Sequence, residues 1–460
     1  MKDFTDWFER ALVEAELVDA RYPVKGMCVW LPYGMKLRTL VLGILRDLLE
    51  QSGHREVLFP LLIPEDQLAK EAEHIRGFEN QVFWVTRGGG EDLDVKLALR
   101  PTSETAMYPM FSLWIRSHTD LPLKVYQVVS VFRCETKMTK PLIRVREVTT
   151  FKEAHTVHAT AEEAERQVRE AVEIYKKFFD SLGIPYLITR RPPWDTFAGA
   201  EYSIAFDTLS PEGKTLQIGT VHNLGQKFSR VFGIEYLDRD GSHKLAYQTC
   251  YGISERVIAS LIFVHGDELG PCFPPSVAPV QVVVVPIPFE GCDPLPLSQE
   301  AEQELRKAGL RVELDAGEQR PGEKFYKWDR KGVPLRVEVG PKEVEGRKVT
   351  CVARDTRERM EVPLEELGTR VKEILRQIEE RLKQRAWEKM KERIAEVRSL
   401  EEVKGEGKVF RFFWCGKREC AERLEAQTGV SVLGQEVEGK EGNCLVCGER
   451  GKSSFLAKSY

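Results

Sequence analysis

Two segments decide the fold of this chain: Val131-Phe132-Arg133-Cys134-Glu135 and, after a basic loop, Arg144-Val145-Arg146-Glu147-Val148-Thr149-Thr150-Phe151-Lys152-Glu153. Apolar segments joined by a polar loop predict an antiparallel hairpin with charges on one face. These residues suit a nucleotide, because arginine donates to phosphate oxygens, glutamate accepts from an exocyclic amine, and Phe151 offers an apolar face to a purine. The residues alone leave an ordinary charged hairpin open as the alternative.

Three motifs in order resemble those of the class II aminoacyl-tRNA synthetases. The pattern F-R-x-E, a loop and R-x-x-x-x-x-x-F is similar to motif 2. Motif 1 is a long helix followed by a strand ending in proline, and residues 33–51 followed by 53–60 fit it. Motif 3 is a strand followed by a helix start with an arginine, and residues 247–256 before the apolar helix 257–264 fit it. The chain is identified by these motifs as a member of that class.

Length and composition limit the number of domains and the kinds of partner that we expect for this protein. Its 460 residues suffice for about three domains. With 68 basic and 72 acidic residues there is no global basic field, so any RNA contact must use local patches. No apolar stretch approaches the ~20 residues of a membrane span, and the N-terminus lacks the layout of a secretory signal. We expect a cytoplasmic protein that binds no membrane.

The first predicted domain covers residues 1–273. A leading helix over 4–18, a charged amphipathic helix over 161–182 and a following strand over 186–188 occur among strands and helices in a non-repeating order. Such an order favours an α+β sheet over a doubly wound one. A proline-rich linker at 270–276 marks its end.

A second domain is predicted over residues 277–370. Strands and helices alternate in it, which is typical of βαβ units. Its place behind a class II core resembles that of the anticodon-binding domain of the prolyl, threonyl, glycyl and histidyl enzymes. A solvated amphipathic helix over 364–400 should follow, with residues 371–402 as the linker. The expected strands are 280–286, 310–314, 335–339 and 348–354, and the expected helices are 299–308 and 324–331.

Four cysteines in the C-terminal segment, residues 403–460, predict a structural zinc site. Cys415 and Cys420 are separated by four residues, and Cys444 and Cys447 by two. Paired thiolates from two turns complete a tetrahedral site, and a lobe this small needs such a staple. A redox pair and plain buried thiols are the alternatives. The other six cysteines are scattered, so no disulfide framework is expected.

Longer segments resemble the prolyl-tRNA synthetases of the archaeal and eukaryotic type over nearly the whole chain. These are R-P-T-S-E-T from Arg100, W-I-R-S-H-x-D-L-P from Trp114, F-K-E-A-H-T-V-H from Phe151, F-A-G-A-E-Y from Phe197 and L-Q-I-G-T-V-H from Leu216. The resemblance implies attachment of L-proline to tRNA(Pro) through prolyl-adenylate, with ATP and Mg²⁺, by a homodimer. It also implies the fold: a class II antiparallel-sheet catalytic domain, an α/β anticodon-binding domain and a small zinc-containing C-terminal domain.

The same resemblance implies roles for single residues. Arg133 would bridge the ATP α-phosphate and the proline carboxylate, and Phe151 and Arg256 would sandwich the adenine. The implied catalytic residues are Arg133 and Arg256. The implied ATP-binding residues are Arg133, Glu135, Arg144, Phe151, Gln217, Thr220 and Arg256. The implied proline-binding residues are Thr102, Glu104, Arg133, Glu153, Phe197, His222 and Ser254. The implied zinc ligands are Cys415, Cys420, Cys444 and Cys447.

Several of these residues have plainer explanations. His222 lies in an apolar stretch and could be a satisfied core histidine, and Gln217 could lie on the solvent face of a strand. His155 and His158 have no cysteine near them in the sequence, so no catalytic metal is expected there. Tyr460 at a free terminus would normally be disordered, although the family directs its terminal tyrosine toward the active site.

Two other functions remain open at this point. A sister synthetase for threonine, serine or glycine is one, although a threonyl enzyme would need a Cys-His-His zinc cluster that the catalytic region lacks. The other is a tRNA-binding or regulatory protein without ligase activity, but such a protein would usually have lost an ATP-contacting arginine. Prolyl-tRNA synthetases of the bacterial type carry a large editing insertion between motifs 2 and 3. Here only about ninety residues separate Glu153 from Tyr247, too few to hold such an insertion. Some mischarging with alanine or cysteine is therefore expected.

Overall fold

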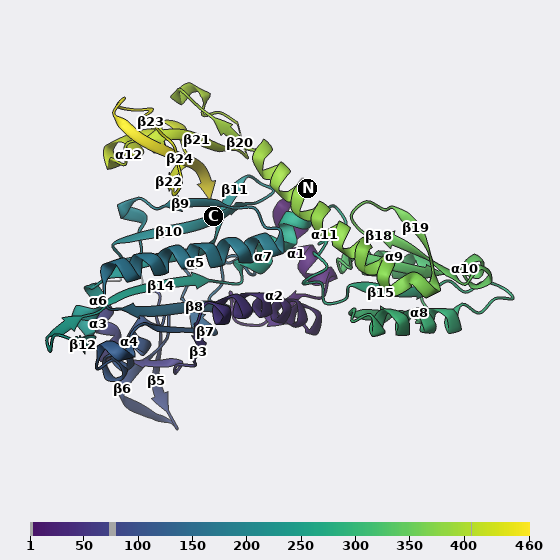
Figure 1. The fold of residues 1–460 in the computed structure, drawn as a ribbon, viewed down its shortest axis with the longest axis horizontal. Coiled ribbons are helices and arrows are strands. Elements are labelled where there is room, and N and C mark those ends of the chain that lie inside the picture. The colour runs from purple at the N-terminus through teal and green to yellow at the C-terminus, as the bar shows by residue number, and fades with distance from the viewer. Residues whose placement is uncertain (1–2, 73–79, 406) are drawn as a thin grey trace.

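One large mixed sheet forms the centre of the protein (Figure 1). The computed structural model describes residues 3–72, 80–405 and 407–460. The sheet has twelve strands in the order β20-β21-β24-β22-β9-β10-β11-β14-β8-β7-β3, with β23 paired to β24. Its catalytic part consists of β3 (Arg55–Glu56), β7 (Leu123–Phe132), β8 (Glu147–His158), β9 (Leu187–Arg190), β10 (Tyr202–Leu209), β11 (Lys214–Gly225) and β14 (Tyr247–Ile253).

The predicted hairpin is confirmed. Strands β7 and β8 are antiparallel, with Leu123 opposite Val157 and Phe132 opposite Glu147. The register shifts at Val129, where a bulge bends the strand before the loop. Residues 133–146 form the loop that joins the two strands, and Arg133 is its first residue.

Helices cover one face of the sheet and bury it. The longest is α5 (Ala161–Leu182), which has the bounds that the sequence predicts. A capping box between Thr160 and Glu163 begins the helix, and Gly183 at φ 64° ends it. Helix α2 (Pro32–Gln51) packs beside α5, as Figure 1 shows. Together with α1 (Phe4–Glu14) and α7 (Arg256–His265), they enclose the main apolar core.

Two predicted elements near the N-terminus are shorter than expected. The first helix ends at Glu14 rather than Val18, because Glu16 adopts a left-handed φ of 53° that an α-helix does not accept. The expected strand over 53–60 pairs only at β3, parallel to β7. The remaining elements of the catalytic domain are β1 (Val18–Asp19), β2 (Val29–Trp30), β4 (Leu62–Pro64), α3 (Glu65–Ala72), β5 (Phe83–Gly88), β6 (Glu91–Leu99), α4 (Glu104–Trp114), α6 (Lys227–Phe232), β12 (Glu235–Leu237) and β13 (His243–Leu245), with 3₁₀ turns at His118–Asp120 and Pro193–Asp195.

The predicted α/β domain is confirmed as a second sheet. Its five strands lie in the order β16-β15-β17-β18-β19, parallel among β16, β15 and β17 and antiparallel beyond. The first strand is buried throughout, as its unbroken valine run predicts. The strands are β15 (Val282–Pro286), β16 (Val312–Leu314), β17 (Leu335–Val339), β18 (Lys348–Ala353) and β19 (Arg359–Pro363), and the helices are α8 (Leu295–Lys307), α9 (Pro321–Arg330), α10 (Pro341–Gly346) and α11 (Leu367–Glu392).

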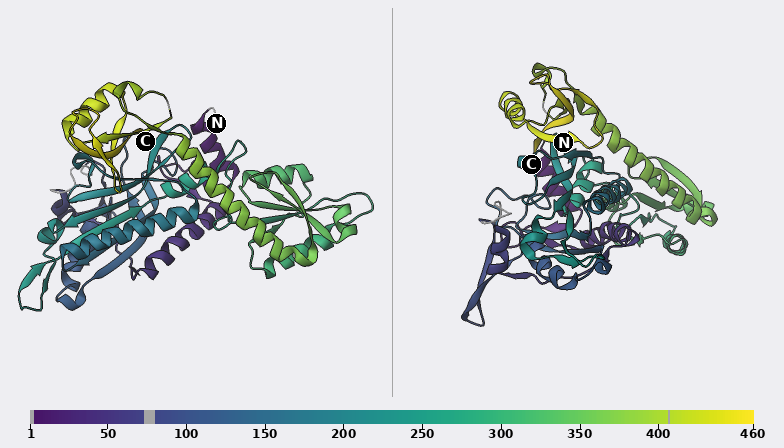
Figure 2. Two further views of the ribbon diagram at one scale, coloured as in Figure 1. Left: turned by 45° about the horizontal axis from the view of Figure 1, so that its top comes forward. Right: turned by 60° about the vertical axis from the view of Figure 1, so that its left-hand side comes forward.

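The expected helix over 364–400 is too long at both ends. Residues Leu364–Glu366 form a 3₁₀ turn and α11 ends at Glu392. Beyond it, β20 (Ile394–Glu396) pairs in parallel with β21 (Val409–Trp414), because Ile394 and Val397 find apolar partners in the C-terminal lobe. Figure 2 shows α11 running from the second domain to that lobe.

The C-terminal lobe, residues 394–460, is continuous with the catalytic sheet. Strand β22 (Ser431–Glu436) pairs with β9, and β24 (Arg450–Ser459) pairs with β11. An apolar cluster that includes Leu187, Leu433 and Phe455 seals the junction. The sequence predicts a separate small module, whereas backbone pairing makes this lobe an extension of the sheet. Its other elements are α12 (Arg418–Thr428), β23 (Glu441–Asn443) and a 3₁₀ turn at Leu400–Glu402.

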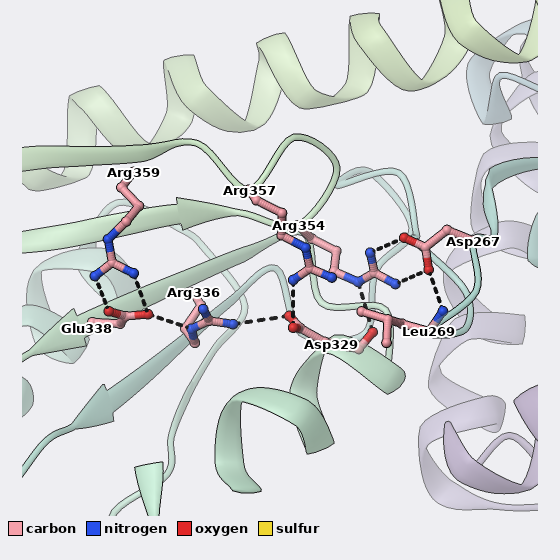
Figure 3. A network of polar contacts seen from close by, with 8 residues as sticks. All are labelled: Asp267, Leu269, Asp329, Arg336, Glu338, Arg354, Arg357 and Arg359. Atoms are coloured by element: carbon pink, nitrogen blue, oxygen red, sulfur yellow. Dashed lines mark hydrogen bonds and ion pairs between the residues drawn. The ribbon is translucent and has the colours of Figure 1, made fainter. Parts of the chain in front are cut away.

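Charged side chains join the second domain to the first. Arg354, which follows β18, donates from both terminal nitrogens to the Asp267 carboxylate just beyond α7 (Figure 3). Its Nε donates to the carbonyl of Asp329 at 3.0 Å. Arg336 extends this network to Glu338 inside the domain. Within the described residues, no helix is both long and apolar enough to cross a membrane.

Candidate active site

A single cavity of about 440 Å³ opens above β8, β11 and β14. The motif 2 loop forms one wall, and the loop between β9 and β10 forms another. All thirteen residues predicted to bind ATP or proline line this cavity. They are Thr102, Glu104, Arg133, Glu135, Arg144, Phe151, Glu153, Phe197, Gln217, Thr220, His222, Ser254 and Arg256. The structure brings them together, and the role of each stays a prediction.

Three arginines give the cavity a positive wall. Arg133 Nε donates to the Pro101 carbonyl at 3.1 Å, and Arg256 Nε donates to the Ile143 carbonyl at 2.9 Å. Burial, together with the charges of Arg133 and Arg144, lowers the pKa of Arg256 to about 10. Since guanidinium groups repel one another here, an anion between them would be strongly favoured. The wall therefore suits a polyphosphate.

The motif 2 loop is held by its own backbone. Lys140 and Arg144 exchange two backbone hydrogen bonds of 2.8 Å, and the Arg133 backbone N–H donates to the Arg146 carbonyl at 2.9 Å. The Arg144 guanidinium lies 3.9 Å from a Glu135 carboxylate oxygen. The loop thus presents one arginine and one acceptor at the mouth of the cavity.

Phe151 provides the apolar face that a base would need. It lies on β8 with the Arg133 guanidinium 5.8 Å from its ring centre. Glu255, the residue before α7, accepts from the Thr150 backbone N–H at 3.0 Å, and burial raises the pKa of Glu255 to about 7. Gln217 and Thr220 line the cavity from β11, as their predicted contact with the nucleotide requires.

Two buried carboxylates with opposite pKa shifts lie deeper in the cavity. Glu104 accepts from the Thr102 hydroxyl, and burial raises the pKa of Glu104. For Glu153, the raising effect of burial is outweighed by the nearby His155 imidazole and by hydrogen bonds from Ser103 and Gln127, which together lower its pKa. One of the pair is therefore held ionised while the other is pushed toward its neutral form. Such a pair can bind an ammonium group while only one of the two carboxylates is negatively charged, so no second buried negative charge is left unpaired.

His222 and Phe197 form the apolar end of the cavity. Their ring centres lie 5.0 Å apart. The His222 ring meets Ser203 Oγ at 2.6 Å and Thr220 Oγ1 at 3.0 Å. Burial lowers the pKa of His222 to about 3, so it is neutral. It is a satisfied histidine that also lines the cavity, and the two explanations of this residue are compatible.

Several lining or supporting residues escape the sequence analysis. Gln127 donates to Glu153 at 2.8 Å and accepts from the Phe59 backbone N–H, yet it lies between the apolar pairs Val125-Tyr126 and Val128-Val129. Trp194 and Asp195 line the cavity just before the F-A-G-A-E-Y segment. A polar residue inside an apolar strand is the one signal that could have identified Gln127.

The fold places a cysteine close to His155, although none is near it in the sequence. Cys250 on β14 lies opposite His155 on β8, and the ligand atoms of Glu104, His155 and Cys250 lie within 4.8 Å of one another. Strand pairing over about a hundred residues of sequence brings them together. His155 Nδ1 meets the Tyr108 hydroxyl at 3.0 Å, and its Nε2 faces Glu153 at 3.6 Å. These contacts explain His155 as a support for the Glu153 carboxylate.

Tyr460 is ordered and packs beside the motif 2 loop. Its hydroxyl donates to Glu212 at 3.2 Å, and its ring centre lies 5.6 Å from the Lys140 ammonium. Lys140 also lies 4.4 Å from the Phe4 ring centre. Tyr460 is absent from the cavity lining, so its contact with the site runs through Lys140.

The four predicted cysteines meet in one place. The sulfur atoms of Cys415, Cys420, Cys444 and Cys447 lie within 4.8 Å of one another, and those of Cys415 and Cys447 are 3.7 Å apart. A tetrahedral zinc site with Zn–S distances near 2.3 Å requires S–S edges of about 3.8 Å. The donor set and the spacing fit a structural zinc ion with all four positions filled by protein.

Three family models cover most of the chain. The class II core domain of tRNA synthetases for G, H, P, S and T matches residues 83–265, an anticodon-binding domain matches 281–374, and the C-terminal domain of prolyl-tRNA synthetase matches 398–460. A proline–tRNA ligase of Methanothermobacter thermautotrophicus is 56% identical over 466 residues, covering 100% of this chain and 96% of that protein.

Two solved structures of prolyl-tRNA synthetases are similar to this structure over nearly its whole length. Prolyl-tRNA synthetase of Giardia lamblia in complex with prolyl-adenylate superposes with a TM-score of 0.96 at 37% identity, over 99% of this chain and 98% of that one. The Cryptosporidium parvum enzyme complexed with L-proline and AMP gives a TM-score of 0.93 at 32% identity, over 100% of this chain and 96% of that one.

Proposed function

This chain belongs to the prolyl-tRNA synthetases, and from that premise we propose that it joins L-proline to tRNA(Pro) in two steps. ATP and proline first give prolyl-adenylate and pyrophosphate, and the prolyl group then passes to the 3′-terminal ribose of the tRNA. The observation that supports this most is one cavity that combines a positive wall, an aromatic face and a carboxylate pair.

Adenylate formation needs positioning more than covalent help. An oxygen of the proline carboxylate attacks the α-phosphorus, and the bond to the pyrophosphate oxygen breaks in line. Arg133, between the carboxylate pair and the motif 2 loop, would neutralise the α-phosphate so that two anions can approach each other. Arg144 would contact the outer phosphates, and Arg256 and Phe151 would enclose the adenine. Glu135 would accept from the adenine amine.

Magnesium is part of the proposal. The cavity wall offers hard oxygen donors from Glu135, Gln217 and Thr220, which fit an ion held chiefly by phosphate oxygens. Such an ion would neutralise phosphate charge when bound.

Recognition of proline would use the deeper half of the cavity. The secondary ammonium has two N–H donors, and the Glu104 and Glu153 carboxylates with the Thr102 hydroxyl supply acceptors. Phe197 and His222 would pack against the ring, and Ser254 would complete the wall. Because an apolar wall discriminates weakly against slightly smaller molecules, alanine and cysteine should be activated at a low rate.

We also propose structural zinc at Cys415, Cys420, Cys444 and Cys447. The 3.7 Å spacing of Cys415 and Cys447 supports this, as does the small size of the lobe. A bound ion would join the two cysteine pairs and so stabilise this small lobe.

A homodimer is the assembly we propose. Leu58 is 81% exposed, and Leu113 and Trp114 are 55% and 43% exposed. Trp114 packs on Phe59, the residue that follows Leu58, at 5.6 Å between ring centres. Exposed large apolar side chains that gather in one region mark interaction surfaces. Leu58→Asp should lower the sedimentation coefficient to that of a monomer. A cytoplasmic location, where translation takes place, completes this proposal.

Charging of tRNA(Pro) with radiolabelled proline tests the function. The wild-type chain should acylate tRNA(Pro) with proline, and Arg133→Ala should reduce the rate about a thousandfold or more while the fold is kept. Lys137→Ala, in the same loop and exposed, is the matched control and should stay active. An active Arg133→Ala enzyme would remove the role given to this arginine.

A further inference from the structure

The loop between β9 and β10, residues 191–201, has two faces. Toward the substrate cavity it presents Trp194, Asp195, Thr196 and Phe197. On its other side a second cavity of about 310 Å³ separates it from the C-terminal lobe, which contributes Trp414, Gly416 and Gln435 to that cavity's lining. The loop therefore stands between the site of chemistry and a lobe that lies outside it.

Arg191 fixes the start of this loop to the lobe. One terminal nitrogen donates to the Leu433 carbonyl on β22 at 2.9 Å, and the other donates to both oxygens of Asp207 at 2.9 Å. The arginine is buried and its charge is neutralised by Asp207, so it makes a specific joint rather than a surface contact.

Trp194 makes the second joint, at the middle of the loop. Its ring meets the Trp414 ring edge-on, with centres 5.9 Å apart and planes at 73°. The Arg418 guanidinium lies 5.6 Å from the centre of the Trp194 ring. Trp414 is buried in the lobe, and its Nε1 donates to the Lys417 carbonyl at 3.0 Å. Trp194 therefore rests on a fixed aromatic partner.

The chain between Trp194 and the pocket wall is short and stiff. Pro192 and Pro193 restrict the backbone, and the Pro192 carbonyl accepts from the Asp195 N–H at 2.9 Å and the Thr196 hydroxyl at 3.0 Å. Three residues after Trp194, the Phe197 backbone N–H donates to Ser203 Oγ at 3.1 Å and its ring packs on His222. A shift of Trp194 would be passed on to Phe197.

We propose that Trp194 is a positioning residue for the amino acid. Clamped by Trp414 and Arg418 of the C-terminal lobe, it holds the 192–197 turn so that Phe197 stays against His222 and closes the apolar end of the cavity. The inference rests on the proposed function, because it assigns the lobe a part in binding proline. The C-terminal lobe would thereby contribute to adenylate formation, although the lobe's cysteine cluster does not line the substrate cavity.

Arg418→Ala is the sharpest test, since Arg418 lines neither cavity. In ATP–pyrophosphate exchange with proline and ATP titrated separately, Trp194→Ala should raise the KM for proline about tenfold and Arg418→Ala about threefold, from loss of the aromatic and cation–π contacts. The KM for ATP and kcat should change less than about twofold. Trp194→Phe should restore most of the proline affinity. Arg423→Ala, exposed on the same helix, is the matched control and should match the wild type.

The outcomes separate the two proposals. A wild-type chain without proline-dependent exchange would overturn the proposed function. An active wild type with an unchanged proline KM in both Trp194→Ala and Arg418→Ala would overturn only the positioning role. Equal changes in both KM values and kcat would also overturn it, because they would show general damage to the site. The double variant should be no worse than Trp194→Ala alone, since both changes break the same clamp.

Discussion

The anticodon-binding domain and the C-terminal lobe are attached to the catalytic domain by different physical means. Charged pairs hold the first: Arg354 with Asp267, Arg330 with Glu14 and Lys331 with Glu16. Backbone ladders hold the second, through β22 on β9 and β24 on β11. A ladder fixes distance and direction residue by residue, whereas ion pairs between side chains permit movement and weaken with salt. From this comparison we expect the lobe to share the rigidity of the site, and the anticodon-binding domain to move more readily than the lobe.

Removal of the metal should have the largest effect. If zinc folds the lobe, a chelator or Cys444→Ser removes a binding free energy on the order of 10 kcal/mol. We expect loss of zinc by elemental analysis, loss of amide protection in β24 by hydrogen exchange, and weaker binding of proline. Cys292→Ser, outside the cluster, should change none of these. Full amide protection in the zinc-free protein would show that the ladder alone holds the lobe.

A change at the ladder itself should come next. Gly434 has φ 138°, and a Cβ there would lie 2.3 Å from the Arg190 carbonyl oxygen on β9. Gly434→Ala should cost about 4 kcal/mol from strain and overpacking together. Gly429→Ala, also left-handed but with open space around it, should cost only about 1 kcal/mol. Chemical denaturation measures the loss in free energy of unfolding for both variants. Equal losses would mean that the close contact between β22 and β9 does not contribute to stability.

Much of the fold follows from sequence pattern, and the ladder shows why the rest does not. The hairpin and α5 are marked by local signals, namely apolar periodicity, a capping box and Gly183. The pairing of Gln435 with Arg190 uses backbone atoms of residues far apart in the chain, which no side-chain pattern announces. The site divides in the same way. Motif residues such as Arg133 are identified by resemblance, whereas Cys250 and Trp194 reach the cavity only through distant packing.

Breaking the charged joint should have an intermediate effect that depends on the reaction step. Arg354 is buried, so Arg354→Ala should cost about 2–3 kcal/mol of contact between the domains. ATP–pyrophosphate exchange should stay within about twofold of the wild type, while tRNA charging should fall about tenfold. Arg357→Ala, whose partner Asp329 lies in the same domain, is the control. Equal losses in both assays would contradict the view that this joint serves only the tRNA.

The charge of the Lys331–Glu16 pair should matter least. The Glu16 side chain is 56% exposed and that of Lys331 is 10% exposed, so Lys331→Ala should lose about 1 kcal/mol of charge interaction with Glu16. We expect a small fall in the denaturation midpoint that disappears in high salt. A loss that persists in high salt would mean that packing by the lysine stem, rather than charge, makes the contact.

The central claim is most directly tested by ATP–pyrophosphate exchange of the wild-type chain with each of the twenty amino acids, with Mg²⁺ and without tRNA. The account predicts that proline gives the strongest exchange and that alanine and cysteine give weak signals. Strongest exchange with threonine, serine or glycine, or none with any amino acid, would contradict it.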